Sequence, residues 1–289
     1  MRNKGTIFIL TAGILWGFMG VFVNTVKSFG FTALECSALR VISASFIFLI
    51  YTALTDRHKL KISLKDIPLL SATGFIGISG MSMLYIMSID KTSLSTAAVL
   101  LYVSPVWVML MSFLFLKDRM TVKKIVAVLM AFLGCFIISG GIKTSINTGI
   151  ILGILSGIAY ASYSIFCAFA LKKYSVITVT TYAFLFGAIL MLFVGAIPSI
   201  MQKFSVQQEF LKVAGAVLLM GLVTAVLPFM FYTKGLEKVP ASKAAVIVCV
   251  EPLTASVLGW VLYNENLNYI GIALIISAIL VLQINKKDL

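Results

Sequence analysis

The sequence carries little charge for its length. Only 11% of its 289 residues are Asp, Glu, Lys or Arg, whereas 61% are hydrophobic. A soluble domain carries roughly 25% charged residues. This balance excludes an ordinary soluble globular protein and is typical of a helical protein that crosses a membrane several times.

The groups that support common kinds of catalysis are also scarce. The single histidine, His58, lies in a basic segment, and the four cysteines lie in apolar runs without a CxxC spacing. No glycine-rich nucleotide-binding loop is present. We therefore predict that the chain is not an enzyme and has no catalytic residue, no metal site and no cofactor. The cysteines are interpreted as small core side chains.

Apolar runs of membrane-spanning length fill most of the chain. A span needs roughly 20 apolar residues, and the short connections between the runs leave no room for a soluble domain. The sequence thus predicts an all-α polytopic membrane protein with ten transmembrane helices. The expected spans are residues 5–26, 32–54, 66–89, 93–115, 121–141, 148–171, 176–198, 210–233, 241–262 and 267–285.

The basic residues are distributed unevenly between the two sides of these spans. Seventeen of the 23 Lys and Arg residues fall on the side of the N-terminus, five fall on the other side, and Arg40 lies within a span. Because cytoplasmic loops are enriched in Lys and Arg, we expect both termini in the cytoplasm and the protein in the cell membrane. The same bias explains most of the net charge of +13 without a nucleic-acid partner.

An internal repeat divides the chain. Residues Leu94–Pro105 read LSTAAVLLYVSP and residues Ala241–Pro252 read ASKAAVIVCVEP, with six of twelve positions identical at an offset of 147. The glycines at 13 and 17 recur at 153 and 157, at an offset of 140. We therefore predict two five-helix repeats, residues 1–145 and 146–289. Since five is odd, the second repeat has the inverted topology, which in secondary transporters permits alternating access around a midplane site.

Glu251 and Pro252 stand near the middle of a predicted span. A carboxylate at that depth is costly and indicates a function or a specific partner. Pro252 lacks an N–H, so the carbonyl of Val248 is predicted to lose its helical partner. Glu251 could bind a substrate ammonium group, take up and release a proton, or stabilise the kink. The corresponding residue in the first half is Ser104, so the charge is not repeated.

Two further charges lie in the second predicted span. Arg40 is too deep to reach the membrane surface easily. It could bind a substrate carboxylate through two hydrogen bonds, tie helix carbonyls together, or pair with Glu251. Glu35 lies at the outer end of the span and is expected to be a solvated end charge.

Aromatic side chains in the interior of the spans complete the candidate binding site. A cavity that they line would suit an apolar or cationic solute through stacking and cation–π contacts. These candidates are Trp16, Tyr85, Tyr102, Tyr160, Tyr163 and Tyr232. Three prolines are candidate hinges or kinks, namely Pro105, Pro228 and Pro252.

These motifs resemble those of the EamA-like family within the drug/metabolite transporter superfamily. The matching features are Leu15-Trp16-Gly17, Arg40, the run from Ser93 to Pro105, Glu251-Pro252, and Glu265 with its first-half counterpart Asp118. Around the two acidic turns, at Arg119-Met120 and Asn266-Leu267, the pattern is less regular. The resemblance implies a pseudo-symmetric basket of ten helices around a central cavity. Members typically export amino acids, other small metabolites or xenobiotics.

The combined prediction is a secondary transporter that exports small metabolites, such as amino acids, by alternating access. Two alternatives stay open: an exporter of xenobiotic or quaternary amines, and a membrane scaffold or sensor that transports nothing. The expected partners are a small-molecule substrate and the lipid bilayer, with no nucleic acid. Proton coupling through Glu251 and the choice between a monomer and a weak homodimer are left open.

Overall fold

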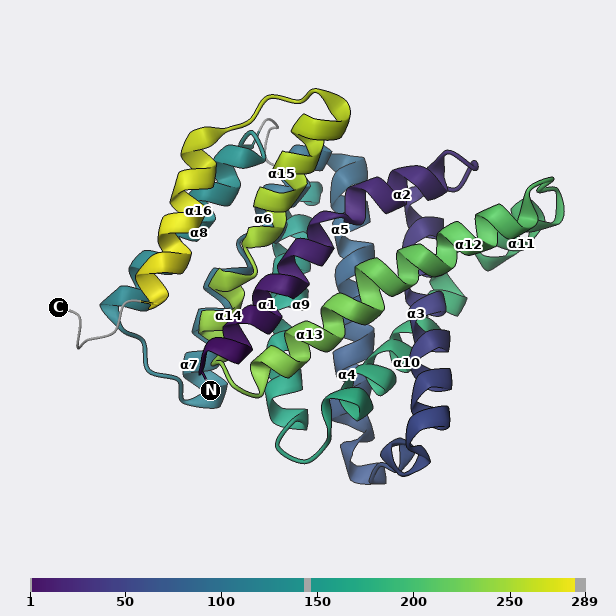
Figure 1. Ribbon diagram of the computed structural model, residues 1–289, viewed down its shortest axis with the longest axis horizontal. Coiled ribbons are helices and arrows are strands. Elements are labelled where there is room, and N and C mark those ends of the chain that lie inside the picture. Colours follow the sequence, from purple (N-terminus) through teal and green to yellow (C-terminus); the bar gives the residue numbers. More distant parts are fainter. Residues whose placement is uncertain (1, 143–146, 284–289) are drawn as a thin grey trace.

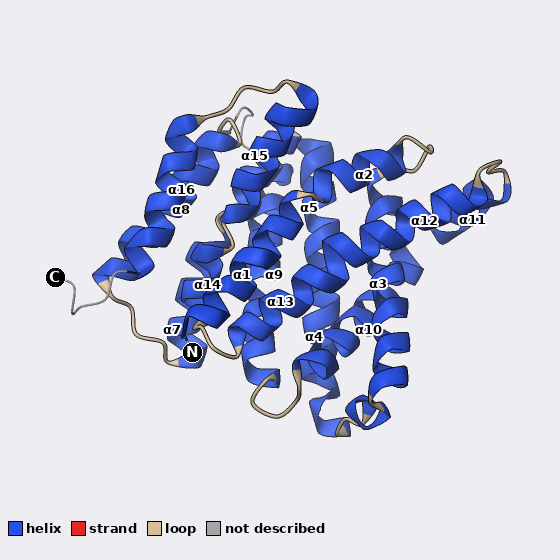
Figure 2. Ribbon diagram, in the orientation of Figure 1, coloured by secondary structure: helices blue, strands red, loops and turns tan. Residues whose placement is uncertain are grey.

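The computed structural model describes residues 2–142 and 147–283, and this part of the chain consists of helices joined by short loops, without a strand (Figure 2). The predicted boundary between the halves, at residues 145 and 146, lies outside the described residues. So do Lys143, Lys286 and Lys287, which contributed to the charge count. The all-α prediction is confirmed for the described chain.

The first half contains the five predicted helical segments. The first is divided at Phe18, and the third contains a π-helical turn that the sequence did not predict. The elements are α1 (Arg2–Gly17), α2 (Met19–Lys27), α3 (Ala33–Thr55), η1 (Arg57–Leu60), η2 (Leu64–Asp66), α4 (Ile67–Gly74), η3 (Phe75–Gly80), α5 (Met81–Lys91), α6 (Leu94–Leu101), α7 (Ser104–Leu116) and α8 (Val122–Ile138).

The second half repeats this order, with its π-helical turn at the equivalent position. The elements are α9 (Thr148–Ala170), α10 (Val176–Val194), α11 (Ile197–Ser205), α12 (Phe210–Gly221), η4 (Leu222–Val226), α13 (Leu227–Leu236), α14 (Ala241–Ile247), α15 (Val250–Tyr263) and α16 (Tyr269–Gln283). The predicted span over residues 176–198 corresponds to α10, which ends four residues earlier, at Val194. Ala196 then takes a left-handed conformation with φ of 57°, and the separate helix α11 begins at Ile197 with Pro198 in its first turn.

Eight segments of the described chain are long and apolar enough to cross a membrane. They run Lys4–Lys27, Ala33–Thr55, Leu64–Lys91, Leu94–Leu116, Thr148–Ala170, Val176–Val194, Phe210–Leu236 and Ala241–Tyr263. Helices α8 and α16, the last of each half, are shorter, with 17 and 15 residues, and pack along each other (Figure 1). The chain is thus a multi-pass membrane protein, and the count of ten spans stays a prediction.

The two halves interlock through their first helices. Helix α1 packs on α13 and α15 of the second half, and α9 packs on α5, α6 and α7 of the first (Figure 1). A Cβ added at Gly17 would lie 3.0 Å from the carbonyl oxygen of Glu251, and one at Gly157 would lie 2.9 Å from that of Leu100. Small residues therefore permit this close approach of helices in both halves.

The four cysteines are all buried and unpaired. Cys135 and Cys249 belong to one hydrophobic cluster, while Cys36 and Cys167 belong to the other. Their interpretation as core side chains is confirmed.

The helix ends define two faces of the molecule. We call the first the basic face; it carries Thr55, Leu116, Ala170, Leu236 and Ala241, and lies beside the N-terminus (Figure 1). The other, the opposite face, carries Lys27, Lys91, Val194 and Tyr263. At the basic face, Lys173 forms an ion pair with Asp66, whose hydrogen bond raises the pKa of the lysine.

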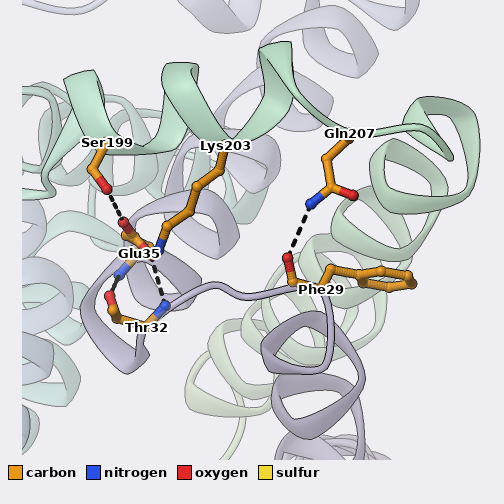
Figure 3. A network of polar contacts seen from close by, with 6 residues as sticks. All are labelled: Phe29, Thr32, Glu35, Ser199, Lys203 and Gln207. Carbon is orange, nitrogen blue, oxygen red and sulfur yellow. Dashed lines mark hydrogen bonds and ion pairs between the residues drawn. The ribbon is translucent and has the colours of Figure 1, made fainter.

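Glu35 at the opposite face is not the solvated end charge that the sequence predicted. Its residue is only 2% exposed. The carboxylate accepts hydrogen bonds from Ser199 at 2.7 Å, from Lys203 at 2.7 Å and from the backbone N–H of Thr32 at 2.6 Å (Figure 3). The prediction was wrong because helix α11, which no span pattern indicated, packs over the beginning of α3 and covers this carboxylate.

Candidate functional site

One helix in each half is broken at the same repeat position. In the first half, α6 ends at Leu101 and α7 begins at Ser104; in the second half, α14 ends at Ile247 and α15 begins at Val250. Pro105 and Pro252 stand in the first turn after each break and are buried. The missing N–H of proline costs little in a first turn, so the residue favours a new helix at that point.

The break in the second half differs in one respect from the sequence prediction. The carbonyl of Val248 is not left free, because it accepts the backbone N–H of Glu251 at 2.9 Å. A tighter, three-residue turn replaces the helical bond that Pro252 cannot make. The Glu251 carboxylate, and not a free carbonyl, is therefore the polar group that this break offers.

Glu251 contacts the broken helix of the first half, between α6 and α7. The Tyr102 hydroxyl, in the turn between α6 and α7, donates to Oε1 of Glu251 at 3.4 Å. The charge of Glu251 also acts on the hydroxyl groups of Tyr85 and Tyr160. All four side chains are half-buried, so each keeps some accessible surface. We call these four residues the central site: Glu251, the Tyr102 hydroxyl that donates to it, and Tyr85 and Tyr160 within electrostatic range of its carboxylate, with residues contributed by both halves.

Arg40 lies beside the two π-helical turns. One guanidinium nitrogen donates to the carbonyl of Thr224 in η4 at 3.4 Å, and another donates to Oγ of Ser82, just after η3, at 3.5 Å. Arg40 is 3% exposed, and no ion pair within 4.0 Å joins it to Glu251. Both contacts are long, and a guanidinium has five N–H donors. Arg40 therefore ties helices of both halves together while keeping donors to spare.

The other three aromatic candidates belong to a packed cluster. Trp16 and Tyr163 pack edge-on against Phe229, and Tyr232 packs against Trp16 and Tyr163. All four are at most 5% exposed. Tyr163 shares a hydrogen bond of 2.8 Å with Thr233, and Tyr232 shares one of 2.8 Å with Ser164. We call these four residues the aromatic cluster. It touches the central site where Trp16 meets the edge of Tyr160, with 6.4 Å between ring centroids.

The repeat geometry matches a known family over nearly the whole chain. The match to the EamA-like transporter family covers residues 3–140 and again residues 147–284. This chain belongs to the EamA-like transporter family. The two matched segments correspond to the two structural halves described above.

Individual relatives of this EamA-like transporter agree with the family match. An uncharacterized transporter of Archaeoglobus fulgidus is 28% identical over 280 residues, covering 96% of this chain and 95% of its own. The uncharacterized inner membrane transporter YicL of Salmonella typhimurium is 23% identical, covering 99% and 97%. A solved crystal structure has the same fold, with a TM-score of 0.81 at 16% identity over 98% of this chain and 97% of its own. The chain is thus a membrane transporter.

Sequence reasoning missed two features of this EamA-like transporter that shape the site. One is the pair of π-helical turns beside Arg40, which bonds Thr224 within η4 and Ser82 just after η3. The other is Phe229, which organises the aromatic cluster. The repeat offset of 147 relates Phe75 in η3 to Leu222 in η4, so alignment of the halves could have shown that the two turns are equivalent. No residue type in either segment signals a π-helical turn by itself.

Proposed function

We propose that this transporter exports small amine-bearing metabolites, amino acids among them, across the cytoplasmic membrane by alternating access. The observation that supports this most is Glu251, a half-buried carboxylate in a broken helix that accepts, within the described part of the chain, a single long hydrogen bond from Tyr102. A carboxylate at that depth without a cationic partner within 4.0 Å is well suited to accept a substrate ammonium group. The surrounding tyrosines add hydroxyl groups and ring faces that attract cations.

The neighbourhood of Glu251 favours a zwitterion over a simple cation. Arg40 keeps spare N–H donors and interacts electrostatically with Glu251. A substrate with both an ammonium and a carboxylate group could therefore bind Glu251 and Arg40 together. A purely cationic amine would meet the same carboxylate and be repelled by the guanidinium. Export of xenobiotic or quaternary amines is therefore the second candidate, favoured by the three tyrosines but opposed by Arg40.

The proposed orientation in the membrane follows from the distribution of charge, and the possible coupling follows from Glu251. We assign the basic face to the cytoplasm because it carries most of the Lys and Arg residues. Both termini then lie inside the cell. Glu251 is also the residue that would carry a proton if export were coupled to a pH gradient. A scaffold or sensor is disfavoured because it would not need two opposed halves.

Transport by purified protein in liposomes tests this proposal. Labelled amino acids, polyamines and quaternary amines would be followed with and without a pH gradient. Loss of a charge-assisted contact worth about 1.5–3 kcal/mol lowers flux about tenfold to hundredfold, which is the expected result for Glu251→Gln. Glu209→Gln is the matched control, because Glu209 is an exposed carboxylate paired with Lys212.

The outcomes separate the candidates. Flux of amino acids that Glu251→Gln removes and Glu209→Gln preserves supports the proposal. Flux of quaternary amines alone supports the second candidate. Flux that is unchanged in Glu251→Gln assigns this residue to the architecture of the helix break and contradicts the proposed site.

A further inference from the structure

Two acidic residues end equivalent helices in the two halves. Asp118 follows α7 and Glu265 follows α15, and the repeat offset of 147 relates them. The same offset relates Ser242 at the beginning of α14 to Ser95 at the beginning of α6. The pair Asp118 and Ser242 lies at the basic face, and the pair Glu265 and Ser95 lies at the opposite face.

The local structure at the two acidic residues is the same. Each helix ends in a left-handed residue, Lys117 with φ of 56° and Asn264 with φ of 54°. The backbone N–H of Asp118 then bonds the carbonyl of Ser112 at 3.1 Å, and that of Glu265 bonds the carbonyl of Gly259 at 3.2 Å. Any difference in the side-chain contacts of the two acids therefore comes from how neighbouring helices are placed, not from the turn itself.

The tertiary contacts of the two acids differ sharply. The Asp118 carboxylate accepts a hydrogen bond from Ser242 on α14 and forms an ion pair of 2.6 Å with Lys124. Glu265 is exposed, and in the described chain its carboxylate has no hydrogen-bond or ion-pair partner. Ser95 is half-buried and likewise makes no side-chain hydrogen bond there. The hydrogen bond between the acid and the serine is thus present at the basic face and absent from the equivalent pair at the opposite face.

A second pair of repeat-related residues shows the same asymmetry on α15 and α7, the helices that carry Glu251 and Ser104. Ala255 lies one turn beyond Glu251 on the same side of α15 and is exposed. Its equivalent, Val108, lies one turn beyond Ser104 on α7 and is only 2% exposed. Ala255 is therefore exposed on the side of α15 that carries Glu251, whereas the equivalent position on α7 is covered.

We propose that these two pairs are the latches of the transport cycle, the Asp118–Ser242 latch closed and the Glu265–Ser95 latch open in this structure. Alternating access by inverted repeats exchanges the conformations of the two halves. In the alternate state, Glu265 would therefore accept the hydrogen bond from Ser95, and Asp118 would release Ser242. This inference rests on the proposed transport function, since a protein without a cycle needs no latch.

The two latches are not equal in charge. The residue equivalent to Lys124 is Gly271, so only the basic-face latch includes an ion pair. An interaction present in one state and absent from the other shifts the equilibrium toward the first. The chain should therefore rest with its basic face closed and its opposite face open.

Cysteine accessibility tests the proposal without requiring transport. Ala255→Cys and Val108→Cys would be introduced separately into the full chain, which would be reconstituted and labelled with a water-soluble cationic methanethiosulfonate. The native cysteines are buried, so the unsubstituted chain gives the background. We expect Ala255→Cys to react at least about tenfold faster than Val108→Cys. Adding Asp118→Ala should reduce this ratio about tenfold, because a charge-assisted bond of the closed latch is lost.

Further variants make the result specific to the latch. Ser242→Ala should change the ratio in the same direction as Asp118→Ala. Asp56→Asn removes a half-buried basic-face carboxylate that pairs with Lys59 at 3.6 Å and should leave the ratio unchanged. A ratio that neither Asp118→Ala nor Ser242→Ala alters would overturn the latch proposal. So would equal labelling at the two positions in the otherwise unchanged chain.

Failure of the latch proposal can be distinguished from failure of the proposed function. A chain that moves substrate, yet whose labelling ratio does not respond to Asp118→Ala, is a transporter without this latch. A chain whose ratio responds as expected but which moves none of the tested amines keeps the latch and loses the proposed substrate class.

Discussion

Glu35 and Glu251 are both carboxylates within membrane-spanning helices, yet their surroundings are opposite. Glu35 is 2% exposed and accepts three hydrogen bonds of 2.6–2.7 Å, one of them from the ammonium group of Lys203. Glu251 is half-buried and has one protein hydrogen bond, from Tyr102 at 3.4 Å. The Glu35 carboxylate is thus well hydrogen-bonded within the protein, whereas the Glu251 carboxylate has little hydrogen bonding to it.

This difference indicates that Glu35 stabilises the fold, whereas Glu251 is available to bind a substrate. A buried charge with all its partners stabilises one arrangement of helices, and removal of a partner leaves an unpaired charge at considerable cost. A charge with few partners contributes little to stability and can bind something that comes and goes. We therefore expect substitutions around Glu35 to lower stability, and substitutions around Glu251 to lower transport.

The largest expected effect on stability follows from Lys203→Met. Removing the cation leaves the Glu35 carboxylate buried without its ion-pair partner, which should cost about 3 kcal/mol of unfolding free energy. Denaturant unfolding in detergent measures this cost. The matched control is Lys212→Met, which breaks the exposed pair with Glu209 and should change stability by less than about 0.5 kcal/mol. Equal losses in the two variants would contradict the assignment of Glu35 to the architecture.

Arg40→Lys tests whether the buried guanidinium is a structural charge like Glu35 or a substrate-binding charge like Glu251. A lysine cannot donate in two directions from a planar group, so contacts with both a helix and a substrate carboxylate should not be kept. We expect amino-acid flux to fall about tenfold, the equivalent of one charge-assisted hydrogen bond. Flux of the corresponding amine without a carboxylate should fall less. A drop in melting temperature with an unchanged preference between the two substrates would place Arg40 beside Glu35 as a structural charge.

Much of this arrangement follows from the sequence alone. Hydropathy gives the helices, and the offset of 147 relates the two broken helices and their prolines. The depth of Glu251 singles it out because a carboxylate in lipid needs a reason. These inferences succeed because they depend on local sequence and on the cost of placing charge in an apolar medium.

Tertiary contacts between the helices were not predictable in the same way. Glu35 lies at the outer end of its predicted span, and only the position of α11 makes it part of an ion pair. Likewise, Tyr85 and Tyr232 are equivalent in the repeat, but Tyr85 is half-buried near Glu251 whereas Tyr232 is packed against Trp16. Which member of such a pair lines the site depends on helix placement, which a single sequence does not specify.

Tyr102→Phe removes the one protein hydrogen bond of Glu251 and keeps the ring. If the hydroxyl helps to hold a substrate beside the carboxylate, its loss should raise the KM for transport about fivefold, which corresponds to about 1 kcal/mol. Melting temperature should not change. The matched control is Tyr163→Phe, which removes the bond to Thr233 inside the aromatic cluster. That variant should lower stability and leave KM unchanged, and the reverse pattern would contradict the division between central site and aromatic cluster.

Ser199→Ala gives the smallest expected effect and tests how fully Glu35 is supported. The substitution removes one of the three hydrogen bonds to the carboxylate and leaves those from Lys203 and Thr32 (Figure 3). Because the charge stays paired, the loss should be about 0.5 kcal/mol, the lower end for a single hydrogen bond. Combined with Lys203→Met, however, the same change should cost more than it does alone, because the two donors share one acceptor. Denaturant unfolding of the two single variants and the double variant measures this coupling. Strict additivity would mean that the carboxylate does not depend on its donors as a group, and the contrast with Glu251 would then rest on burial alone.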